Sequence, residues 1–327
     1  SIVLSSDDPV ESKIIKLNDI AERSVDISGI GMYALGKHKK SMSDKIHKVL
    51  AVSGLGSRRE AERWIAQGRV FVNGKIAKVG DRAVSSDKIM LDGKLIAITP
   101  QGYTRILMYN KPEGEICSTI DEKGRPTVYK QLPRLSKGRW ISVGRLDINT
   151  SGLLLFTDNG ELANRLMHPS YEIARQYLVR IYGVVNLSMI TRLTKGVTLD
   201  DGIGKFDSVK ANLDSRSDNE INSSNKWYRI TISEGRKREV RRLWESQGVE
   251  VNRLKRISFG PIELPSIVRK GEFMFLNEFQ TKSLLGIVKL EAKSYPEKEI
   301  YKHMRKRKEK KLRARGNNNG HQRKKGP

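Results

Sequence analysis

The spacing of hydrophobic positions predicts two short helices at the start of a regular region that begins near residue 43. Ile46, Val49 and Leu50 recur three and four positions apart, behind Ser43 or Asp44 as the N-cap. Two glycines follow within six residues of this pattern and end the helix. We therefore expect an amphipathic helix with one apolar face turned toward a small core.

The second helix carries a stronger start signal. Ser57 is followed three residues later by Glu60, which is the spacing of a capping box. Ala61, Trp64 and Ile65 then fall on one helical face, and a glycine ends the helix. Two hairpin signals come next, at the dipeptides 73–74 (Asn-Gly) and 92–93 (Asp-Gly). Two helices followed by a small sheet make a unit of about half a standard domain.

The middle of the chain combines a polar loop with a continuous apolar run. Residues 153–156 are Leu-Leu-Leu-Phe without alternation, which predicts a strand buried on both faces. The preceding residues 144–152 have turn formers at both ends and place Arg145 two positions before Asp147. Many enzymes hold a reactive group on a loop supported by a buried strand. From these residues alone, a turn-capping role for Asp147 is the more common one.

The rest of the central region alternates between strand and helix patterns. Period-two or continuous apolar segments predict strands at 105–109, 140–143, 175–181 and 227–233. Helical spacing predicts helices at 161–167, at 189–193 and around Val240, Leu243 and Trp244.

The charge of the chain points to a polyanionic partner. Its formal net charge is +25 and its pI is about 10.1, and the last 32 residues contain 13 Lys or Arg against three Glu. Such a segment cannot form a core, and we expect a basic tail that orders on RNA. An acidic membrane surface is the competing partner, but no amphipathic apolar stripe accompanies the lysines. The N-terminal residues 1–41 have balanced charge and weak periodicity, which predicts a poorly ordered extension.

Metal, disulfide and membrane classes have little support in the sequence. Cys117 is the single cysteine, and the five histidines show no metal-ligand spacing. No apolar run is long enough to span a bilayer, and no basic-then-apolar signal segment opens the chain. We therefore expect a cytoplasmic protein without a metal, a cofactor or a membrane contact.

Three segments resemble signatures of the pseudouridine synthases, in the branch that includes the small-subunit ribosomal enzyme and the large-subunit enzymes B, E and F. GRLDINTSGLLLFTDNG (144–160) is similar to the first signature, and NKPEGEICST (110–119) to the opening of the domain. SEGRKREVRRLWESQG (233–248), followed by VNRLKRISFGPIELP (251–265), is similar to the third. The resemblance covers about residues 42–277 and leaves both ends outside it.

The resemblance implies a role for five residues. Asp147 is the catalytic residue, and Arg241 pairs with its carboxylate and keeps it ionised. Tyr177 stacks on the flipped base and Leu254 lines the pocket. Arg145 contacts the phosphate of the target nucleotide or fills the space that the base leaves. The target uridine has to leave its stack to react, because its reacting atoms are inaccessible in a helix.

The segment SRREAERWIAQGRVFVNGKIAKVGD (57–81) resembles an S4 domain, a small RNA-binding module. Ser57, Arg58 and Arg59 lie at a helix N-terminus, where main-chain N–H groups favour phosphate. Arg69 and Lys75 lie on or beside the first hairpin and extend the same basic face. These contacts position RNA and do not read its sequence.

Together these features predict an α+β protein with four parts. Residues 1–41 form the extension, 42–100 the α/β S4 domain, 104–292 a catalytic domain with a mixed, mainly antiparallel sheet flanked by helices, and 293–327 the basic tail. The predicted activity is isomerisation of uridine to pseudouridine in ribosomal RNA, most consistent with 23S RNA, free or in a pre-ribosomal particle, by a monomer. Within the branch, the tail and the wording RRLWESQG favour enzyme B. Action on 16S RNA, or a non-catalytic role in RNA binding or ribosome assembly, remains the alternative.

Overall fold

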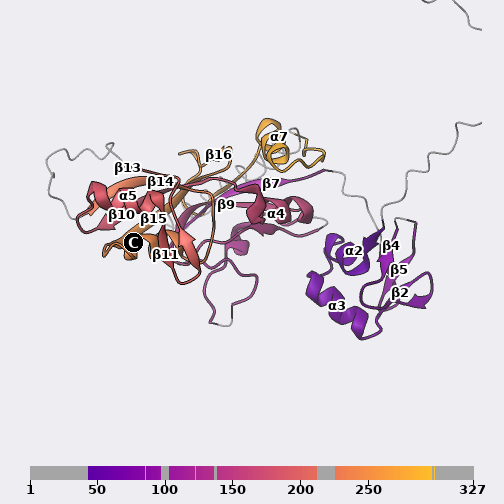
Figure 1. Ribbon diagram of the computed structural model, residues 1–327. Coiled ribbons are helices and arrows are strands. Elements are labelled where there is room, and N and C mark those ends of the chain that lie inside the picture. The colour runs from indigo at the N-terminus through magenta and orange to yellow at the C-terminus, as the bar shows by residue number, and fades with distance from the viewer. Residues whose placement is uncertain are drawn as a thin grey trace, which may run out of the picture. The chain divides into compact units, whose positions relative to one another are not determined.

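The computed structural model describes residues 43–84, 86–96, 103–121, 123–135, 138–211, 225–296 and 298. The predicted N-terminal extension, residues 97–102 and nearly all of the basic tail lie outside the described residues. The described parts fold into a small N-terminal α/β unit and a larger unit built on one sheet (Figure 1).

The small unit packs two helices against short strands. A four-stranded antiparallel sheet has the order β3-β2-β5-β6, and a separate two-stranded pair joins β1 to β4. A core of eight buried hydrophobic residues, among them Ile46, Leu50 and Ile65, holds helices and strands together. The elements are β1 (Asp44–Lys45), α2 (Ile46–Val52), α3 (Arg58–Ala66), β2 (Val70–Val72), β3 (Lys75–Ile76), β4 (Arg82–Ala83), β5 (Ile89–Leu91) and β6 (Lys94–Ile96).

Most local signals of this unit are confirmed, and one is wrong. Ser57 and Glu60 form both hydrogen bonds of the capping box, at 3.1 and 2.6 Å. The two predicted hairpins join β2 to β3 and β5 to β6, and all four turn residues have positive φ. The predicted cap at Ser43 or Asp44 is not formed, because Asp44 is extended in β1 and its carboxylate accepts from Lys48 at 2.8 Å.

The larger unit contains a nine-stranded sheet. Seven strands follow the order β13-β14-β10-β15-β9-β7-β17, while β8 pairs with β9 and β16 with β15. Every pair is antiparallel except β15 with β9, so the predicted mixed, mainly antiparallel sheet is confirmed. The strands are β7 (Ile106–Lys111), β8 (Ile141–Val143), β9 (Ser151–Thr157), β10 (Arg175–Tyr182), β13 (Ser208–Ala211), β14 (Asn225–Ile232), β15 (Glu250–Phe259), β16 (Ile262–Glu263) and β17 (Phe273–Phe275).

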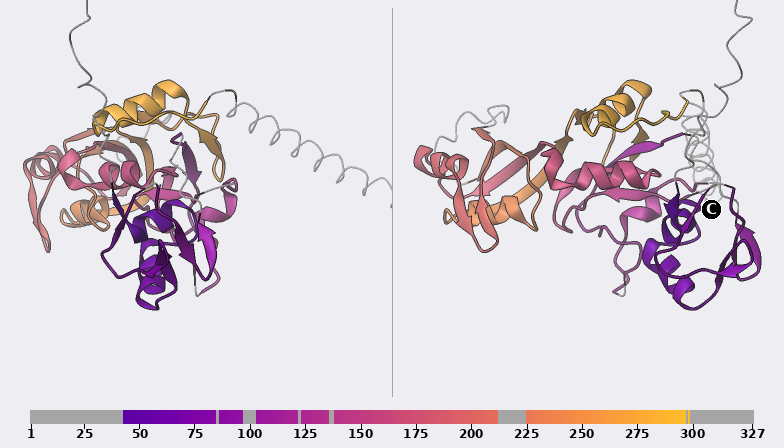
Figure 2. Two further views of the ribbon diagram at one scale, coloured as in Figure 1. Left: turned by 90° about the vertical axis from the view of Figure 1, so that its right-hand side faces the viewer. Right: turned by 45° about the vertical axis from the view of Figure 1, so that its right-hand side comes forward.

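Helices pack on both faces of this sheet, which explains the continuous apolar run of β9. Leu154 and Phe156 face one core with residues of α5 (Leu187–Lys195) and α6 (Glu239–Glu245). Leu153 and Leu155 face a second core with residues of α4 (Gly160–Met167) and α7 (Glu278–Ile287). All seven residues of β9 are buried, as predicted for a strand covered on both sides. Figure 2 shows α5, β13 and β14 at one end of the sheet and α7 toward the other.

Smaller elements connect these strands. A two-stranded hairpin, β11 (Val197–Leu199) and β12 (Gly202–Gly204), follows α5. Two 3-10 turns, η1 (Val128–Gln131) and η2 (Pro169–Tyr171), lie before β8 and before β10. The helix predicted around Val240 ends as expected near Gly248, which has a φ of +76°.

The parallel contact of β9 with β15 requires a glycine. Gly152 pairs with Arg256 and has a φ of +102°, and a Cβ at this position would collide with the main chain of Arg256. Arg256 in turn pairs with Tyr177 on β10. The close approach therefore brings the loop that carries Asp147 next to β15 and β10.

Candidate active site

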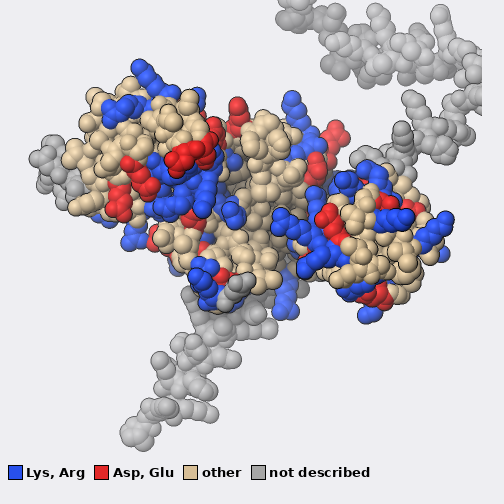
Figure 3. All heavy atoms as spheres, turned by 60° about the horizontal axis from the view of Figure 1, so that its bottom comes forward, with Lys and Arg blue, Asp and Glu red and all other residues tan. Residues whose placement is uncertain are grey.

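A cavity of about 1250 Å³ opens at the end of the sheet where β9 begins. Its walls come from residues 142–150, from β10 and β15, from the segment 234–240 and from the loop 116–125. Eight Lys or Arg residues and four Asp or Glu residues line it. Figure 3 shows Lys and Arg side chains gathered beside a few acidic ones on the face that it presents. A cavity with this excess of cations favours an anionic ligand.

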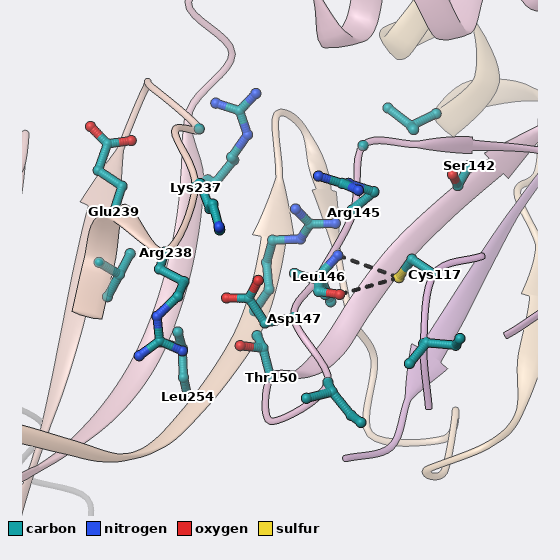
Figure 4. Close-up of a pocket in the computed structure, with 18 of the residues that line it drawn as sticks. Cys117, Ser142, Arg145, Leu146, Asp147, Thr150, Lys237, Arg238, Glu239 and Leu254 are labelled. Carbon is teal, nitrogen blue, oxygen red and sulfur yellow. Dashed lines mark hydrogen bonds between the residues drawn. The ribbon is translucent and has the colours of Figure 1, made fainter. Parts of the chain in front are cut away.

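Asp147 differs from the other acids of this cavity. Three of the four carboxylates form ion pairs with arginines at 2.7 to 3.0 Å, namely Asp121 with Arg125, and Glu234 and Glu239 with Arg236. Asp147 is the one cavity carboxylate that no cation of the described residues pairs with. Figure 4 shows it directed into the cavity, between Arg145 on one side and Lys237 and Arg238 on the other. A side chain in this position is available to a ligand.

The main chain around Asp147 is held by a buried lysine. Lys111 ends β7 and is 0% exposed. Its ammonium group donates hydrogen bonds to the main-chain oxygens of Asp147 (3.1 Å), Thr150 (2.9 Å), Ile148 (3.4 Å) and Pro112 (3.0 Å). Burial lowers the pKa of Lys111, and nearby negative groups, Asp147 among them, partly offset this effect. The lysine therefore fixes the loop and adds positive charge beneath the carboxylate.

Arg241 holds the remaining carbonyl of this loop. It lies on α6, is 7% exposed, and donates from Nη2 to the oxygen of Asn149 (3.1 Å) and from Nη1 to that of Val251 (2.6 Å). Burial lowers its pKa, while the charge of Asp147 acts in the opposite direction. The expected ion pair with Asp147 is not formed among the described residues, because the guanidinium group is bound to these main-chain oxygens. Arg241 therefore holds the loop that carries the acid and forms no direct contact with the carboxylate among the described residues.

Cys117 contacts the residue before Asp147. Its Sγ accepts from the N–H of Leu146 at 3.4 Å and donates to the oxygen of the same residue at 3.3 Å (Figure 4). Burial raises the pKa of the thiol, so the neutral form that can donate is favoured. The loop 116–125 is in this way attached to the segment that carries the acid.

The other residues expected at the site line the same cavity. Tyr177 on β10 is 9% exposed and Leu254 on β15 is 4% exposed. Arg145 lies on the wall, with its side chain exposed. The structure therefore brings Asp147, Tyr177, Leu254 and Arg145 to one cavity, while Arg241 lies behind its wall.

Three of the expected RNA contacts in the small unit are exposed. Arg58 and Arg59 occupy the first turn of α3, and Lys75 opens β3. The side chain of Ser57 has a structural partner, since it accepts from the N–H of Glu60. A hydroxyl used in this way has a remaining donor for a ligand.

Arg69 is committed to a local contact. Its guanidinium group forms two hydrogen bonds with the carboxylate of Asp92, at 2.8 and 2.6 Å, and lies 5.9 Å from the ring centre of Trp64. This pair links the start of β2 to the turn between β5 and β6. A contact from Arg69 to RNA would compete with this bidentate ion pair.

Four residues at the site were not expected from the sequence: Lys111, Cys117, Arg175 and Arg256. Lys111 lies in the segment NKPEGEICST, and a lysine at the end of an otherwise apolar strand was the available signal. Arg256 follows Leu254 by two positions, so the alternation of a strand puts it on the same face. Nothing local marks Cys117, because its partner Leu146 is 29 residues away.

None of the helices described is both long and apolar enough to cross a membrane. Within the described residues, no group of three or more His, Cys, Asp or Glu side chains is arranged to hold a metal ion.

Comparison with known proteins identifies the class that this fold and site define. The RNA pseudouridylate synthase family matches residues 105–246, and the S4 domain matches residues 45–89. The chain belongs to the RNA pseudouridylate synthase family and carries an S4 domain. The predicted family, fold class and enzyme class, an isomerase, are confirmed.

Several relatives carry the name ribosomal large subunit pseudouridine synthase B. The protein of Pseudomonas aeruginosa is 50% identical over 78% of this chain, and those of Salmonella typhi (50%) and Escherichia coli K12 (49%) match over 76%. The chain spans 65% of the Pseudomonas protein and 84% of each of the other two. The chain is also similar to a crystal structure of a pseudouridylate synthase, with 28% sequence identity and a TM-score of 0.51. The match covers 73% of this chain and 99% of that chain.

Proposed function

We propose that this protein converts a specific uridine of large-subunit ribosomal RNA to pseudouridine, with Asp147 as its catalytic residue. The observation that carries the proposal is the state of this carboxylate. It lines a basic cavity without an ion-pair partner among the described residues, while its main chain is fixed by buried cations. A rigid loop with an unengaged acid is the arrangement that positioned catalysis needs.

The reaction rearranges bonds within one nucleotide. The bond from N1 of uracil to C1′ breaks, the base turns, and C5 forms a new bond to C1′. The proton on C5 is then lost and N1 gains one, so no group leaves and no redox partner is needed. Asp147 acts on this centre as nucleophile or as base. Lys111 and Arg241 fix the loop that carries it through hydrogen bonds to the main-chain oxygens of Asp147 and Asn149.

The cavity has groups for the other parts of the substrate. Tyr177 offers a flat, nearly buried ring on which the extruded base can stack, and its phenol can assist removal of a sugar proton. Leu254 closes the apolar wall of the pocket. The exposed side chain of Arg145 can contact the phosphate of the target nucleotide or occupy the space that the base leaves.

The large subunit is supported as the target by the names of the relatives. The S4 domain and the net charge of +25 support a structured, polyanionic substrate, such as 23S RNA or a pre-ribosomal particle. We further propose that the enzyme acts as a monomer in the cytoplasm. The competing candidates are a uridine of 16S RNA and a role in assembly without catalysis.

Mapping of pseudouridine in both ribosomal RNAs, from cells with and without this protein, tests the proposal. We expect one pseudouridine, or a few neighbouring ones, to disappear from 23S RNA and to return when the wild-type gene is restored. If a pseudouridine disappears from 16S RNA instead, the target uridine belongs to the small subunit. An unchanged pattern in both RNAs would refute the catalytic proposal and leave the assembly role.

A further inference from the structure

Two arginines of the cavity lie beside Tyr177 and have no ion-pair partner among the described residues. Arg175 precedes Tyr177 by two residues on β10, and Arg256 is its register partner on β15. Nη1 of Arg175 donates to three main-chain oxygens, of Ile173, Ser233 and Glu234, at 2.8 to 3.1 Å. No carboxylate of the described chain forms an ion pair with either guanidinium group.

Arg256 is the more unusual of the two. It is 3% exposed, its Nε donates to the oxygen of Leu153 at 2.7 Å, and its Nη2 has no hydrogen-bond partner within the described structure. A buried guanidinium nitrogen left without an acceptor costs free energy, because the group has lost its water. Such a nitrogen at the wall of a ligand cavity indicates a partner that arrives with the ligand.

The two guanidinium groups are held in place by one ring. Their central carbons lie 5.2 Å (Arg175) and 5.4 Å (Arg256) from the ring centre of Phe259. Gly235, in the segment after β14, lies beside Arg175, and a Cβ there would be 3.4 Å from the guanidinium carbon, an ordinary contact distance. Backbone bonds and the aromatic ring therefore orient both cations before any ligand binds.

Electrostatics make this pair unfavourable without an anion. Burial lowers the pKa of Arg175 and the charge of Arg256 lowers it further, while Tyr177 and Glu239 offset this only in part. Two like charges kept close in a low-dielectric cavity repel each other, and main-chain oxygens compensate them only in part. A ligand with a negative charge relieves both penalties, and forked guanidinium groups match the oxygens of a phosphate.

We infer that Arg175 and Arg256 form a phosphate subsite that binds one backbone phosphate next to the uridine whose base stacks on Tyr177. The inference rests on the proposed function, because it takes RNA as the ligand. It assigns the two arginines to substrate binding and leaves Asp147 as the reacting group. The exposed cations at the rim, Lys123 and Lys237, are then secondary contacts.

Binding to a single modified RNA tests the subsite directly. The probe is a stem-loop that contains the uridine found by mapping, measured with the full chain carrying Asp147→Asn so that no turnover occurs. Replacing the phosphates on each side of that uridine one at a time by an uncharged methylphosphonate should weaken binding at one linkage by about tenfold. Equal affinity for every substituted RNA overturns the inference, and this result does not depend on any arginine variant folding.

Arginine variants identify the groups that contact this phosphate. Arg256→Gln and Arg175→Gln, each added to Asp147→Asn, should weaken binding of the unmodified RNA by about tenfold. They should also lower the slope of log K against log salt by about one. On the methylphosphonate RNA that affects the parent protein, these variants should show little further loss. If the variants instead lose the same factor in affinity on the methylphosphonate RNA as on the unmodified RNA, the arginines are structural, which contradicts the subsite.

Arg165→Gln is the matched control. Like Arg175, Arg165 donates to main-chain oxygens, but it is paired with Glu161 and lies on α4 outside the cavity wall. It should leave affinity and salt slope unchanged, and the same loss in this variant would refute the inference. Turnover of the same RNA by the wild-type chain is measured in parallel. Absence of product refutes the proposed function, whereas product formation with unaltered binding in the variants refutes only the subsite.

Discussion

The ammonium group of Lys111 donates a hydrogen bond of 3.1 Å to the main-chain oxygen of Asp147. The same group binds the oxygens of Ile148 and Thr150, and Arg241 binds that of Asn149. Two buried cations thus hold four successive carbonyls, while the Asp147 side chain remains directed into the cavity. The backbone of the loop is thus fixed by hydrogen bonds, while the carboxyl group of Asp147 remains available to a ligand.

Lys111→Met should lower stability and kcat and leave RNA affinity nearly unchanged. The substitution leaves the carbonyls of the Asp147 loop without their donor, so we expect the free energy of unfolding to fall by roughly 3 kcal/mol. The acid is also released from its position, and kcat should fall about 100-fold. RNA affinity should stay within about twofold, since Lys111 is buried away from the surface that meets RNA.

Denaturant unfolding, kcat and the Kd for RNA check this prediction. Lys282→Met is the control, because Lys282 is an exposed lysine on α7 that pairs only with Glu278 among the described residues. A Lys111→Met enzyme with wild-type kcat would show that the loop does not need the ammonium group.

The activity should fall at alkaline pH as Lys111 loses its proton. Burial lowers the pKa of this lysine. The ammonium form is therefore lost at a lower pH than in an exposed lysine, whose pKa is about 10.4. We therefore expect kcat to fall at a pH below that value in the wild-type protein. In Lys111→Arg, whose side chain stays charged, the fall should occur at a higher pH. Short single-turnover assays across the range measure it, and an identical fall in both proteins would assign the titration elsewhere.

Arg241→Ala should cost activity far more than Lys306→Ala. The first change leaves the oxygens of Val251 and Asn149 without a donor and removes a cation near the acid, so kcat should fall about 100-fold. Lys306 belongs to the basic C-terminal segment, outside the described residues, and its loss should weaken affinity modestly and flatten its salt dependence. Single-turnover rates and binding at several salt concentrations distinguish the two. Equal effects on kcat would refute the division of roles.

Gly152→Ala should disrupt the junction of β9 with β15. The residue has a φ of +102°, and its Cβ would meet the main chain of Arg256. We expect a loss of roughly 2–4 kcal/mol in the free energy of unfolding, because the strain of the left-handed conformation and the steric collision add. Gly74→Ala is the matched control, since Gly74 also has a positive φ but has open space around it, and should cost about 1–2 kcal/mol. Equal melting temperatures of the two variants would contradict the close approach.

Local signals were sufficient to predict most elements of the fold. The capping box at Ser57, the Asn-Gly and Asp-Gly turns and the apolar run of β9 each depend on a few neighbouring residues, and each is found in the structure. The prediction of a cap at Asp44 was wrong because the conformation of this residue depends on a distant part of the chain. Its conformation is set by pairing with Ala83, which lies 39 residues further on and gives no local signal.

The candidate site was predictable in its residues and less so in its contacts. The signatures led to Asp147, Tyr177 and Leu254, which line one cavity. They did not reveal that Lys111 and Arg241 bind main-chain oxygens, because a sequence pattern records side chains and does not show which carbonyls a fold leaves without donors. The ion pair expected for Arg241 is replaced by such bonds.

The most direct test of the account is product formation and RNA binding by Asp147→Asn. The change removes the charge of the carboxylate and keeps its shape, so the loop held by Lys111 should persist. We expect no detectable pseudouridine in the target RNA and a Kd within about twofold of wild type, because binding arises from the basic surfaces. Product formation by this variant, or a loss of binding that parallels the loss of activity, would contradict a catalytic role for Asp147.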